Sequence, residues 1–490
     1  MPLYKVKVKW GKDLFENVEA NSDEEPMLFK AQLYALTGVQ PDRQKVMIKG
    51  ATLKDDDWGS IKLKDGIMIL MMGSKEEDHL KLDSVEKVTF VEDLSESELA
   101  TAMELPAGLS NLGNTCYMNA TVQCLRTVPE LREALKRFAG GMTLAGTMVP
   151  PQSITAALRD LYDAMDKSSS TIPPILLLQV LHLAFPRFAE KSEHGGFVQQ
   201  DANECWTELV RMLQQKLVPN PNTNEEGQEI ESSTSNFIDQ FFGGTFDVTF
   251  KCNECEDEPE THTSESFLQL SCFITPEVKY LHSGLKMRMH ESITKHSPQL
   301  DRDATYTKTS KISRLPAYLT IQFVRFFYKE KGSINAKILK DVKFPLSLDV
   351  FDLCSAELQQ KLVPMRTKFK VIEDRKVEEA QKGQTNTEAS KAVKGDKNKK
   401  VHPYWIANDV GSNNSGYYEL QAVLTHQGRS SSSGHYVGWS RKNKEEWIKC
   451  DDDKISIIAS EDVLKLSGGG DWHCAYVLLY GPRILEVDDN

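Results

Sequence analysis

Two segments of the chain, more than three hundred residues apart, contain side chains that together could perform nucleophilic catalysis. Cys116 lies in the first segment, Gly108–Asn119, and His435 lies in the second, where an acidic run begins at Asp451. A thiol, an imidazole and a carboxylate in the order Cys, His, Asp are the functional groups of a cysteine hydrolase. These residues provide the main functional signal of the sequence.

Cys116 is predicted to lie in the first turn of a helix. Met118, Val122 and Leu125 follow it with helical spacing, and Pro129 marks the end of the helix. In that position the helix dipole and the unpaired N–H groups favour the thiolate form. The alternative is a buried structural cysteine, which is the most common role of a free cysteine. The polar approach to Cys116, rich in glycine and asparagine, argues against burial and favours a reactive thiol.

The candidate general base is His435, which follows a loop rich in glycine and serine and leads into an apolar strand. His426 is the rival, but it precedes this loop and lacks a following acid at comparable spacing. Two adjacent antiparallel strands would place Asp451 beside the imidazole, where a carboxylate fixes the tautomer and stabilises the imidazolium. Asp452 and Asp453 stay open as alternatives, although at least one of them is expected to belong to a solvated acidic turn.

Asn111 lies five residues before Cys116, in the loop that leads to the nucleophile. A side-chain amide can donate a hydrogen bond to the oxyanion of a tetrahedral intermediate. An asparagine in a loop is more often a turn residue, so the residue by itself leaves both roles open.

The segments around these residues resemble a known enzyme family. Gly108–Asn119 is similar to the cysteine box of the ubiquitin-specific proteases. Other parts of the match are similar to the histidine box and to further family segments: Gly434–Tyr436, Trp447–Asp451, Ala475–Tyr480, Gln199–Glu204 and Leu315–Phe326. In Gln199–Glu204, Asp201 and Glu204 are also spaced to cap a following helix. The match covers roughly residues 105 to 482.

The resemblance implies a cysteine-type deubiquitinase with the papain-like arrangement of thumb, palm and fingers. It assigns Cys116 as nucleophile, His435 as general base, Asp451 as the residue that orients His435, and Asn111 as support for the oxyanion. The implied substrate is ubiquitin on a protein, cut at the isopeptide bond after the C-terminal glycine of ubiquitin. The implied chemistry needs no cofactor.

The chain is expected to be an α+β protein of two domains. Residues 1–74 have the order β-β-α-β-β, with Pro26 in the first turn of the helix and Gly38 after its end, and they resemble the β-grasp of a ubiquitin-like domain. An unrelated small α+β domain is the alternative. A linker with a short helix is expected over residues 75–104, followed by the catalytic domain over 105–483. Mobile insertions are expected near 219–235 and 375–400.

A ubiquitin-like domain joined to this catalytic domain resembles the proteasome-associated branch of the family. That resemblance implies docking of residues 1–74 on the regulatory particle of the 26S proteasome. It also implies low activity until docking, because two surface loops, 328–340 and 428–434, would restrict the cleft. Phosphorylation of the serines at 430–433 is a further hypothesis for loop control.

One feature departs from many family members, which hold a structural zinc ion in the fingers between two Cys-x-x-Cys pairs. Cys252 and Cys255 form a single such pair here, and no second pair is present in the sequence. A closed tetrahedral zinc site needs four ligands, so no bound metal is expected.

Bulk composition restricts the other possibilities. With 490 residues, 40% of them hydrophobic and 27% charged, the chain is expected to form globular domains. A net charge of -12 argues against general binding to nucleic acid or anionic membranes. No apolar run is long enough for a transmembrane helix, and the N-terminus lacks the apolar block of a signal peptide.

Cysteine usage indicates the compartment. Nine cysteines, an odd number scattered over a long chain, fit a reducing environment. Cys124, Cys205 and Cys474 lie in apolar stretches and are predicted to be structural. The expected location is the cytoplasm, with the nucleus as a second compartment.

Two other functions stay open. The chain could be a ubiquitin-binding scaffold docked on the proteasome without catalysis, or a protease for another ubiquitin-like modifier. Away from the proteasome it is expected to be a monomer.

Overall fold

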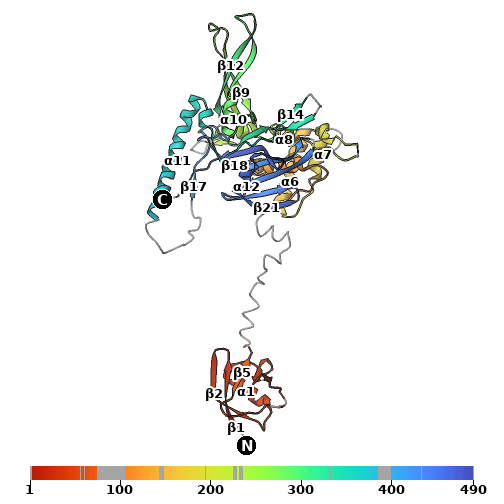
Figure 1. The fold of residues 1–490 in the computed structure, drawn as a ribbon, viewed down its shortest axis with the longest axis vertical. Coiled ribbons are helices and arrows are strands. Elements are labelled where there is room, and N and C mark those ends of the chain that lie inside the picture. The colour runs from red at the N-terminus through yellow and green to blue at the C-terminus, as the bar shows by residue number, and fades with distance from the viewer. Residues whose placement is uncertain are drawn as a thin grey trace. The chain divides into compact units, whose positions relative to one another are not determined.

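The computed structural model divides the chain into two compact units, Met1–Ser95 and Glu96–Asn490. Both are seen in Figure 1. The structure describes residues 3–55, 57–59, 61–73, 105–142, 148–193, 195–223, 229–230, 235–329, 334–383, 399–431 and 433–488. The predicted linker with its short helix lies outside the described residues.

The first unit is a five-stranded sheet with one α-helix packed on a face. Its elements are β1 (Leu3–Trp10), β2 (Asp13–Asn21), α1 (Pro26–Thr37), η1 (Pro41–Arg43), β3 (Lys45–Ile48), β4 (Ala51–Thr52) and β5 (Met68–Met72). The strand order is β2-β1-β5-β3-β4, with β1 parallel to β5 and the other pairs antiparallel. This is the β-grasp predicted from the sequence, with the short additional strand β4.

Local signals explain these elements. Val6 and Val8 are buried on one face of β1, where they pack with Phe29 and Leu33 of α1. The helix ends where Gly38 adopts the left-handed conformation (φ 71°), and its N–H donates to the carbonyl of Tyr34. α1 begins at Pro26, which agrees with the prediction of a proline in the first helical turn.

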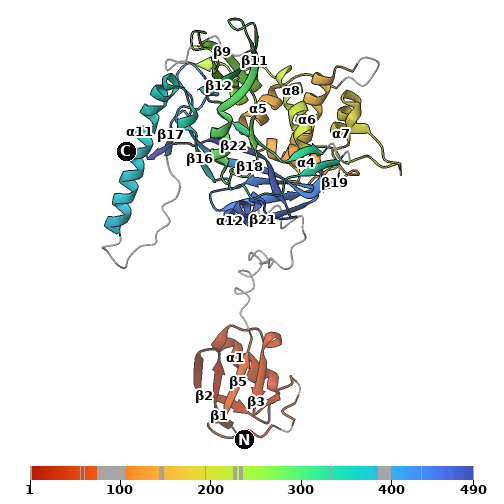
Figure 2. The ribbon, with the colours of Figure 1, turned by 45° about the horizontal axis from the view of Figure 1, so that its top comes forward.

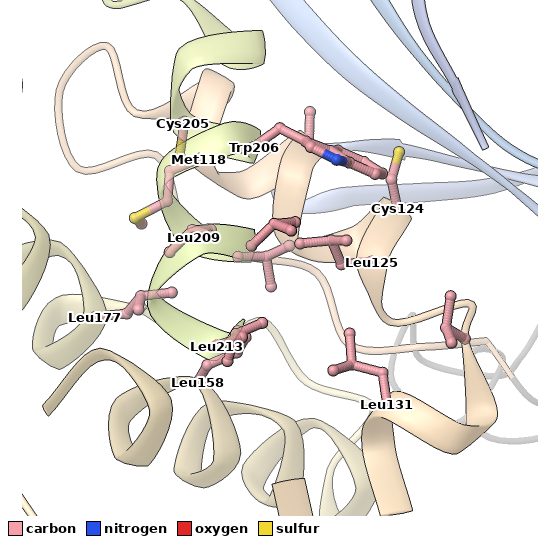
Figure 3. Packing of buried hydrophobic residues seen from close by; sticks show 14 of the residues in the cluster. Met118, Cys124, Leu125, Leu131, Leu158, Leu177, Cys205, Trp206, Leu209 and Leu213 are labelled. Atoms are coloured by element: carbon pink, nitrogen blue, oxygen red, sulfur yellow. The ribbon is translucent and has the colours of Figure 1, made fainter. Parts of the chain in front are cut away.

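Helices form the thumb of the second unit. They are α4 (Cys116–Leu125), α5 (Pro129–Arg137), α6 (Pro150–Lys167), α7 (Ile175–Ala184), η3 (Pro186–Ala189), α8 (Ala202–Gln214) and α9 (Phe237–Phe242). Figure 3 shows how Met118 and Leu125 of α4 face Leu209 and Leu213 of α8 in a shared hydrophobic core. All ten residues of α4 are buried. Tight packing on every side holds this helix, and therefore its first residue Cys116, in a fixed position.

The palm is an eight-stranded sheet. Along it lie β10 (Leu270–Phe273), β13 (Leu319–Val324), β22 (Cys474–Pro482), β18 (Tyr417–Ser430), β19 (Ser433–Arg441), β20 (Glu446–Asp451) and β21 (Lys454–Ala459), while β16 (Ser347–Asp349) pairs with β18. Helix α4 packs against β19 and β18, as Figure 2 shows. Accordingly, the helix that begins at Cys116 lies next to the strand that contains His435.

The fingers are a four-stranded sheet in the order β11-β12-β8-β9, which extends from the body of the second unit (Figure 1). The strands are β8 (Gly244–Cys252), β9 (Thr261–Phe267), β11 (His290–Ser297) and β12 (Arg302–Arg314). Glu258 accepts hydrogen bonds from Ser297 and Tyr306 beside the buried Cys252. Among the described residues, Cys252 and Cys255 belong to no group of three or more potential metal ligands. The absence of zinc remains a prediction.

The other elements border these three parts. They are α10 (Leu281–Arg288), β14 (Phe326–Lys329), β15 (Ile334–Lys337), η4 (Phe351–Leu353), α11 (Ala356–Gly383), β17 (Lys399–Val401), α12 (Ser460–Leu464), η5 (Lys465–Ser467) and β23 (Glu486–Asp488). Within the described parts of the chain, no helix is both long and apolar enough to cross a membrane.

The two predicted insertions are described in part. The sequence predicts a mobile segment from residue 375, but helix α11 continues to Gly383, because the glutamate, glutamine and alanine residues at 378–381 favour helix. Residues 384–398 lie outside the described residues. In the other insertion, Asn222–Thr223 (β6) pairs with Glu229–Ile230 (β7).

Candidate active site

Cys116 is the first residue of α4, as the sequence predicts. The chain turns sharply before it, with positive φ angles at Gly113 (101°) and Asn114 (56°). Glycine and asparagine are the residues that adopt this conformation at low cost, which explains the polar approach to the helix. Thr115 completes the turn by accepting a 2.9 Å hydrogen bond from the N–H of Leu112.

The expectation that the polar approach keeps Cys116 unburied is wrong. Its relative exposure is only 2%, and it belongs to the hydrophobic core cluster of the thumb. All ten residues of α4 are buried, so the polar residues that precede Cys116 in the sequence do not determine its exposure. A buried thiol next to a polar turn still suits catalysis when a base reaches it directly.

His435 and Asp451 come together through the pairing of β19 with β20. The two strands are antiparallel, with Gly438 opposite Cys450. Residues that precede Gly438 on β19 therefore lie beside residues that follow Cys450 on β20. Nε2 of His435 is 2.6 Å from Oδ1 of Asp451, and Nζ of Lys449 is 2.9 Å from the other carboxylate oxygen. The spacing of sixteen residues between the histidine and the acid therefore has the geometry predicted for it.

The electrostatics of the site favour a charged imidazole. Hydrogen bonds with Asp451 and then with Cys116 raise the pKa of His435 from its usual value of 6.5 to about 10, against the opposing effect of burial. Because Nε2 faces Asp451, the thiol is left with Nδ1. The hydrogen bond with His435, aided by Lys449, holds the pKa of Asp451 below its usual range. The arrangement stabilises an imidazolium beside the sulfur atom, as nucleophilic thiol chemistry requires.

Asn111 has a structural role that agrees with the turn-residue alternative. Its Oδ1 accepts hydrogen bonds from the N–H groups of Gly113 (3.0 Å) and Thr115 (3.2 Å). Its Nδ2 donates to Oδ2 of Asp452 at 2.9 Å. The side chain is exposed and fixed at both ends, so the amide is held in one orientation. The predicted contribution to an oxyanion site remains a prediction.

Asp452 is the residue whose importance the sequence analysis underestimated. Its Oδ1 accepts a 2.8 Å hydrogen bond from Nδ2 of Asn119, and its backbone carbonyl accepts one from the N–H of Leu109. Together with Asn111, these contacts join the acidic run to the cysteine segment. The signal available in the sequence was Asn119, three residues after Cys116 and therefore near the same face of the helix.

Potential ligand atoms of His435, Asp451 and Asp452 lie within 4.8 Å of one another. The existing partners of these groups argue against a metal ion. Asp451 is already bonded to His435 and Lys449, and Asp452 accepts from two asparagine amides. Their arrangement fits hydrogen bonding within a hydrolase site better than metal coordination.

The geometry favours His435 over the rival histidine, His426, as the base. It is fully buried, and its Nε2 is 3.1 Å from the carbonyl oxygen of Ser433. Burial lowers the pKa of His426 to about 3, so this ring is neutral at physiological pH. It supports the loop that leads to His435.

His473 is a neighbour that the sequence analysis missed. Its ring centroid is 6.1 Å from that of His435, and its Nδ1 is 3.2 Å from Oγ1 of Thr425. Burial is the main cause that lowers the pKa of His473 to about 4. Repulsion from the positive charge of His435 lowers the pKa in the same direction. A neutral ring there adds no competing positive charge beside the imidazolium.

Two hairpins border the site. β14 and β15 form one, which overlaps the predicted loop 328–340, and β18 and β19 form the other, around 428–434. Nζ of Lys337, at the base of the first, donates a 2.6 Å hydrogen bond to the carbonyl of His426, at the base of the second. Burial lowers the pKa of this lysine to about 8. Arg429 in the second hairpin forms a 3.0 Å ion pair with Asp471. Of the four serines at 430–433, residue 432 lies outside the described residues.

The segment Gln199–Glu204 lies beside the histidine box. Asp201 caps α8 by accepting from the N–H groups of Asn203 and Glu204, as predicted. The hydroxyl of Tyr476 on β22 also donates to this carboxylate, and its oxygen lies 2.9 and 2.8 Å from the two oxygens of Asp201. This contact joins the thumb to the palm close to the site.

Comparisons with known proteins agree with this geometry. A family model described as ubiquitin carboxyl-terminal hydrolase matches residues 107–480. The chain is 41% identical over 494 residues to ubiquitin carboxyl-terminal hydrolase 6 of Arabidopsis thaliana, covering 98% of this chain and 99% of the relative. It is 40% identical over 492 residues to ubiquitin carboxyl-terminal hydrolase 14 of Caenorhabditis elegans, covering 99% and 94%.

A similar protein is also known from fission yeast. Ubiquitin carboxyl-terminal hydrolase 6 of Schizosaccharomyces pombe is 39% identical over 502 residues, covering 97% of this chain and 98% of the relative. Among solved structures, the fold is similar to a chain of the SAGA Ubp8/Sgf11/Sus1/Sgf73 DUB module bound to ubiquitin aldehyde. That match has a TM-score of 0.51 and 20% identity, and covers 89% of this chain and 78% of the other.

Proposed function

The chain belongs to the ubiquitin carboxyl-terminal hydrolase family and is a cysteine-type deubiquitinase, and from this premise we propose that it releases ubiquitin from conjugates at the proteasome. The observation that carries the catalytic part is the contact of Cys116 with His435, which is itself bonded to Asp451. No other histidine in the described residues combines these two contacts.

The proposed reaction begins when the Cys116 thiolate attacks the carbonyl carbon of the C-terminal glycine of ubiquitin. The negative charge on the carbonyl oxygen is stabilised by N–H groups at the start of α4 and by the amide of Asn111. His435 then gives its proton to the leaving lysine amine, and a thioester forms. His435 next takes a proton from water, which attacks the thioester and releases ubiquitin with a free carboxylate. The thiol and the imidazole are regenerated.

The proposal of proteasome docking rests on the first unit. Alternate residues of β5 are exposed, namely Met68 (49%), Leu70 (37%) and Met72 (50%). The strand pairs with β1 so that Lys7 lies beside Met68 and Lys9 beside Leu70. An apolar strip bordered by positive charge is the kind of surface that binds another protein. The partner that we propose is the regulatory particle of the 26S proteasome.

Control by loops is the second part of the proposal. Lys337 links the two hairpins at their bases, and Arg429 with Asp471 fixes the second hairpin to a neighbouring turn. Hairpins joined in this way would move together, so a single event could open or close access to Cys116. We propose that docking provides this event in the cytoplasm and the nucleus, and that the free protein is a monomer.

A ubiquitin that carries a C-terminal electrophile tests the catalytic assignment. The chain should be labelled at Cys116, and the Cys116→Ala variant should not be labelled. Labelling of the variant would show that a nucleophile other than Cys116 reacts, whereas no labelling of the unaltered chain even with proteasomes would favour the scaffold function. Stronger labelling by a different ubiquitin-like modifier would instead favour the protease for that modifier.

A second experiment tests docking. Binding to purified proteasomes is compared for Leu70→Glu on β5 and for the control Leu28→Glu, an exposed leucine on α1 of the same unit. The β5 variant should lose binding and stimulation of ubiquitin hydrolysis, whereas the control should keep both. Equal binding of the two variants would refute docking through β5.

A further inference from the structure

A cleft of about 650 Å³ lies at the C-terminal end of α4, the helix whose first residue is Cys116. Its walls come from the ends of α4 and α6, from α5, and from β19 and β20. The volume is within the range of pockets that hold small ligands. The cleft contains none of the residues assigned to the reaction.

The walls of this cleft are rich in positive charge. Arg126, Arg132, Lys167 and Arg441 line it, and Asp166 is the carboxylate among the lining residues. The chain as a whole has a net charge of -12, so the concentration of cations here is opposite to the average of the molecule. Clefts lined by one sign of charge concentrate ligands of the other sign.

Asp166 does not cancel this charge. Its two oxygens are bonded to Nη2 of Arg126 at 2.6 Å and to Nζ of Lys136 at 2.9 Å, so one carboxylate faces two cations. Arg441 is paired with Glu419 outside the lining, at 2.5 Å. The remaining positive charge of the cleft is carried by Arg132 and Lys167.

Arg132 provides the most specific observation. In the described parts of the chain its guanidinium takes part in no hydrogen bond or ion pair, and its Nε is buried without a partner, as is Nε of Arg126. Buried donors without acceptors are uncommon in folded proteins, because losing water without a replacement costs free energy. These two Nε atoms are closed to the cleft as well as to water, but the terminal nitrogens of Arg132, on the cleft wall, form no hydrogen bond or ion pair with the described residues and are the donors for an acceptor from outside the chain.

We propose that this cleft binds a small molecule that carries several phosphate groups. A planar guanidinium forms two parallel hydrogen bonds with a phosphate, which suits the arginines. The hydroxyls of Thr127, Ser168 and Ser440 line the same cleft and supply neutral donors for further phosphate oxygens. Because α4 joins the cleft to Cys116, the ligand would contact the same rigid helix that positions the nucleophile. The proposal does not depend on docking to the proteasome.

The test is isothermal titration calorimetry of the full chain with inorganic tripolyphosphate at low ionic strength. Arg132→Gln should weaken binding by about tenfold or more, the effect of losing a charged hydrogen-bonding partner. Arg302→Gln is the matched control, an exposed arginine of the fingers paired with Glu254. Because the guanidinium of Arg132 makes no hydrogen bond or ion pair with the described residues, and glutamine keeps most of the aliphatic stem, both variants should keep the melting temperature of the unaltered chain.

Further arms identify the source of the phosphates. Adenosine triphosphate and an inositol hexakisphosphate are titrated under the same conditions, and the ligand with the highest affinity that depends on Arg132 identifies the class. One saturable site that is weakened in Arg132→Gln alone supports the proposal. Equal weakening of binding in both variants overturns the proposal, because general attraction between cations and a polyanion would explain it. The absence of saturable binding at millimolar tripolyphosphate also overturns the proposal.

Discussion

Replacing Asp451 by asparagine removes the main stabiliser of the His435 imidazolium and keeps the size of the side chain. The pKa of His435 rises from 6.5 to about 10 in the folded protein, with the hydrogen bond to Asp451 as the largest cause. At ~1.4 kcal/mol for each tenfold change in proton affinity, this difference has an upper limit of ~5 kcal/mol. The side chain of His435 is 34% exposed, so screening by water reduces the contribution to about 1–2 kcal/mol.

The sign of the pH dependence follows from linkage. The folded pKa of His435 is above its unfolded value, so its contribution to stability is complete below pH 6.5 and is lost as the pH rises through about 10. Asp451 has a folded pKa below its usual range, so its contribution is present above pH 3.8 and is lost under more acidic conditions. Asp451→Asn should therefore lower the free energy of unfolding by about 1–2 kcal/mol near pH 6 and by much less above pH 10.

Two measurements check this prediction. Urea denaturation of both proteins at several pH values between 6 and 10.5 gives the difference in unfolding free energy, and a fluorogenic ubiquitin substrate gives kcat/KM over the same range. The variant should lose roughly 10²- to 10⁴-fold in kcat/KM at neutral pH, because the imidazole loses both its orientation and its charge partner. A stability difference that does not change with pH, together with full activity of the variant, would show that Asp451 does not control His435.

Four other predictions concern residues around the site and the fingers. Asp452→Ala should lower kcat/KM for the fluorogenic substrate by ~10- to 100-fold, because Asn111 and Asn119 lose their common acceptor. The control Asp453→Ala, at an exposed position, should leave hydrolysis of this substrate unchanged. Gly108→Ala should lower the unfolding free energy by about 1–3 kcal/mol in urea denaturation, because its Cβ would lie 2.5 Å from the carbonyl oxygen of Asp453, and Gly141→Ala is the control with open space around it. Lys337→Met should raise the basal hydrolysis rate several-fold without changing the rate on proteasomes, since the hairpins lose their shared hydrogen bond. Elemental analysis of the purified chain should show no stoichiometric zinc, and a chelator should not change its melting temperature, because the fingers offer one Cys-x-x-Cys pair only.

Features that depend on neighbouring residues in the sequence could be predicted well. Pro26 and Gly38 mark the two ends of α1 because proline is fixed near the helical φ and glycine adopts the left-handed conformation at low cost. Cys116 begins α4 because the glycine and asparagine before it allow a turn that other residues resist. The contact between His435 and Asp451 also follows from a local rule, since two consecutive antiparallel strands bring such residues together.

Features that depend on distant segments could not be predicted in this way. The burial of Cys116 results from packing of α4 against α8 and the palm, which no local pattern reveals. Two opposing effects decide whether α11 continues past residue 375: the helix propensity of its residues, and the absence of a core partner for them. The prediction from composition gave too much weight to the missing core partner, and the helix continues to Gly383. The role of Asp452 depends on its positive φ of 53°, which turns its carboxylate toward the cysteine segment.

Asp452 also explains how two separately packed halves form one site. The proposed nucleophile Cys116 is fixed by α4, and the proposed base His435 with Asp451 is fixed by β19 and β20, so a small shift between helix and sheet would separate sulfur from imidazole. Leu109 bonds to the carbonyl of Asp452, Asn119 bonds to its carboxylate, and Gly108 packs directly on the backbone of Asp453. These contacts fix the distance between the halves without using the thiol or the imidazole. The reacting groups are consequently free to exchange protons during the reaction while the surrounding hydrogen bonds preserve the geometry.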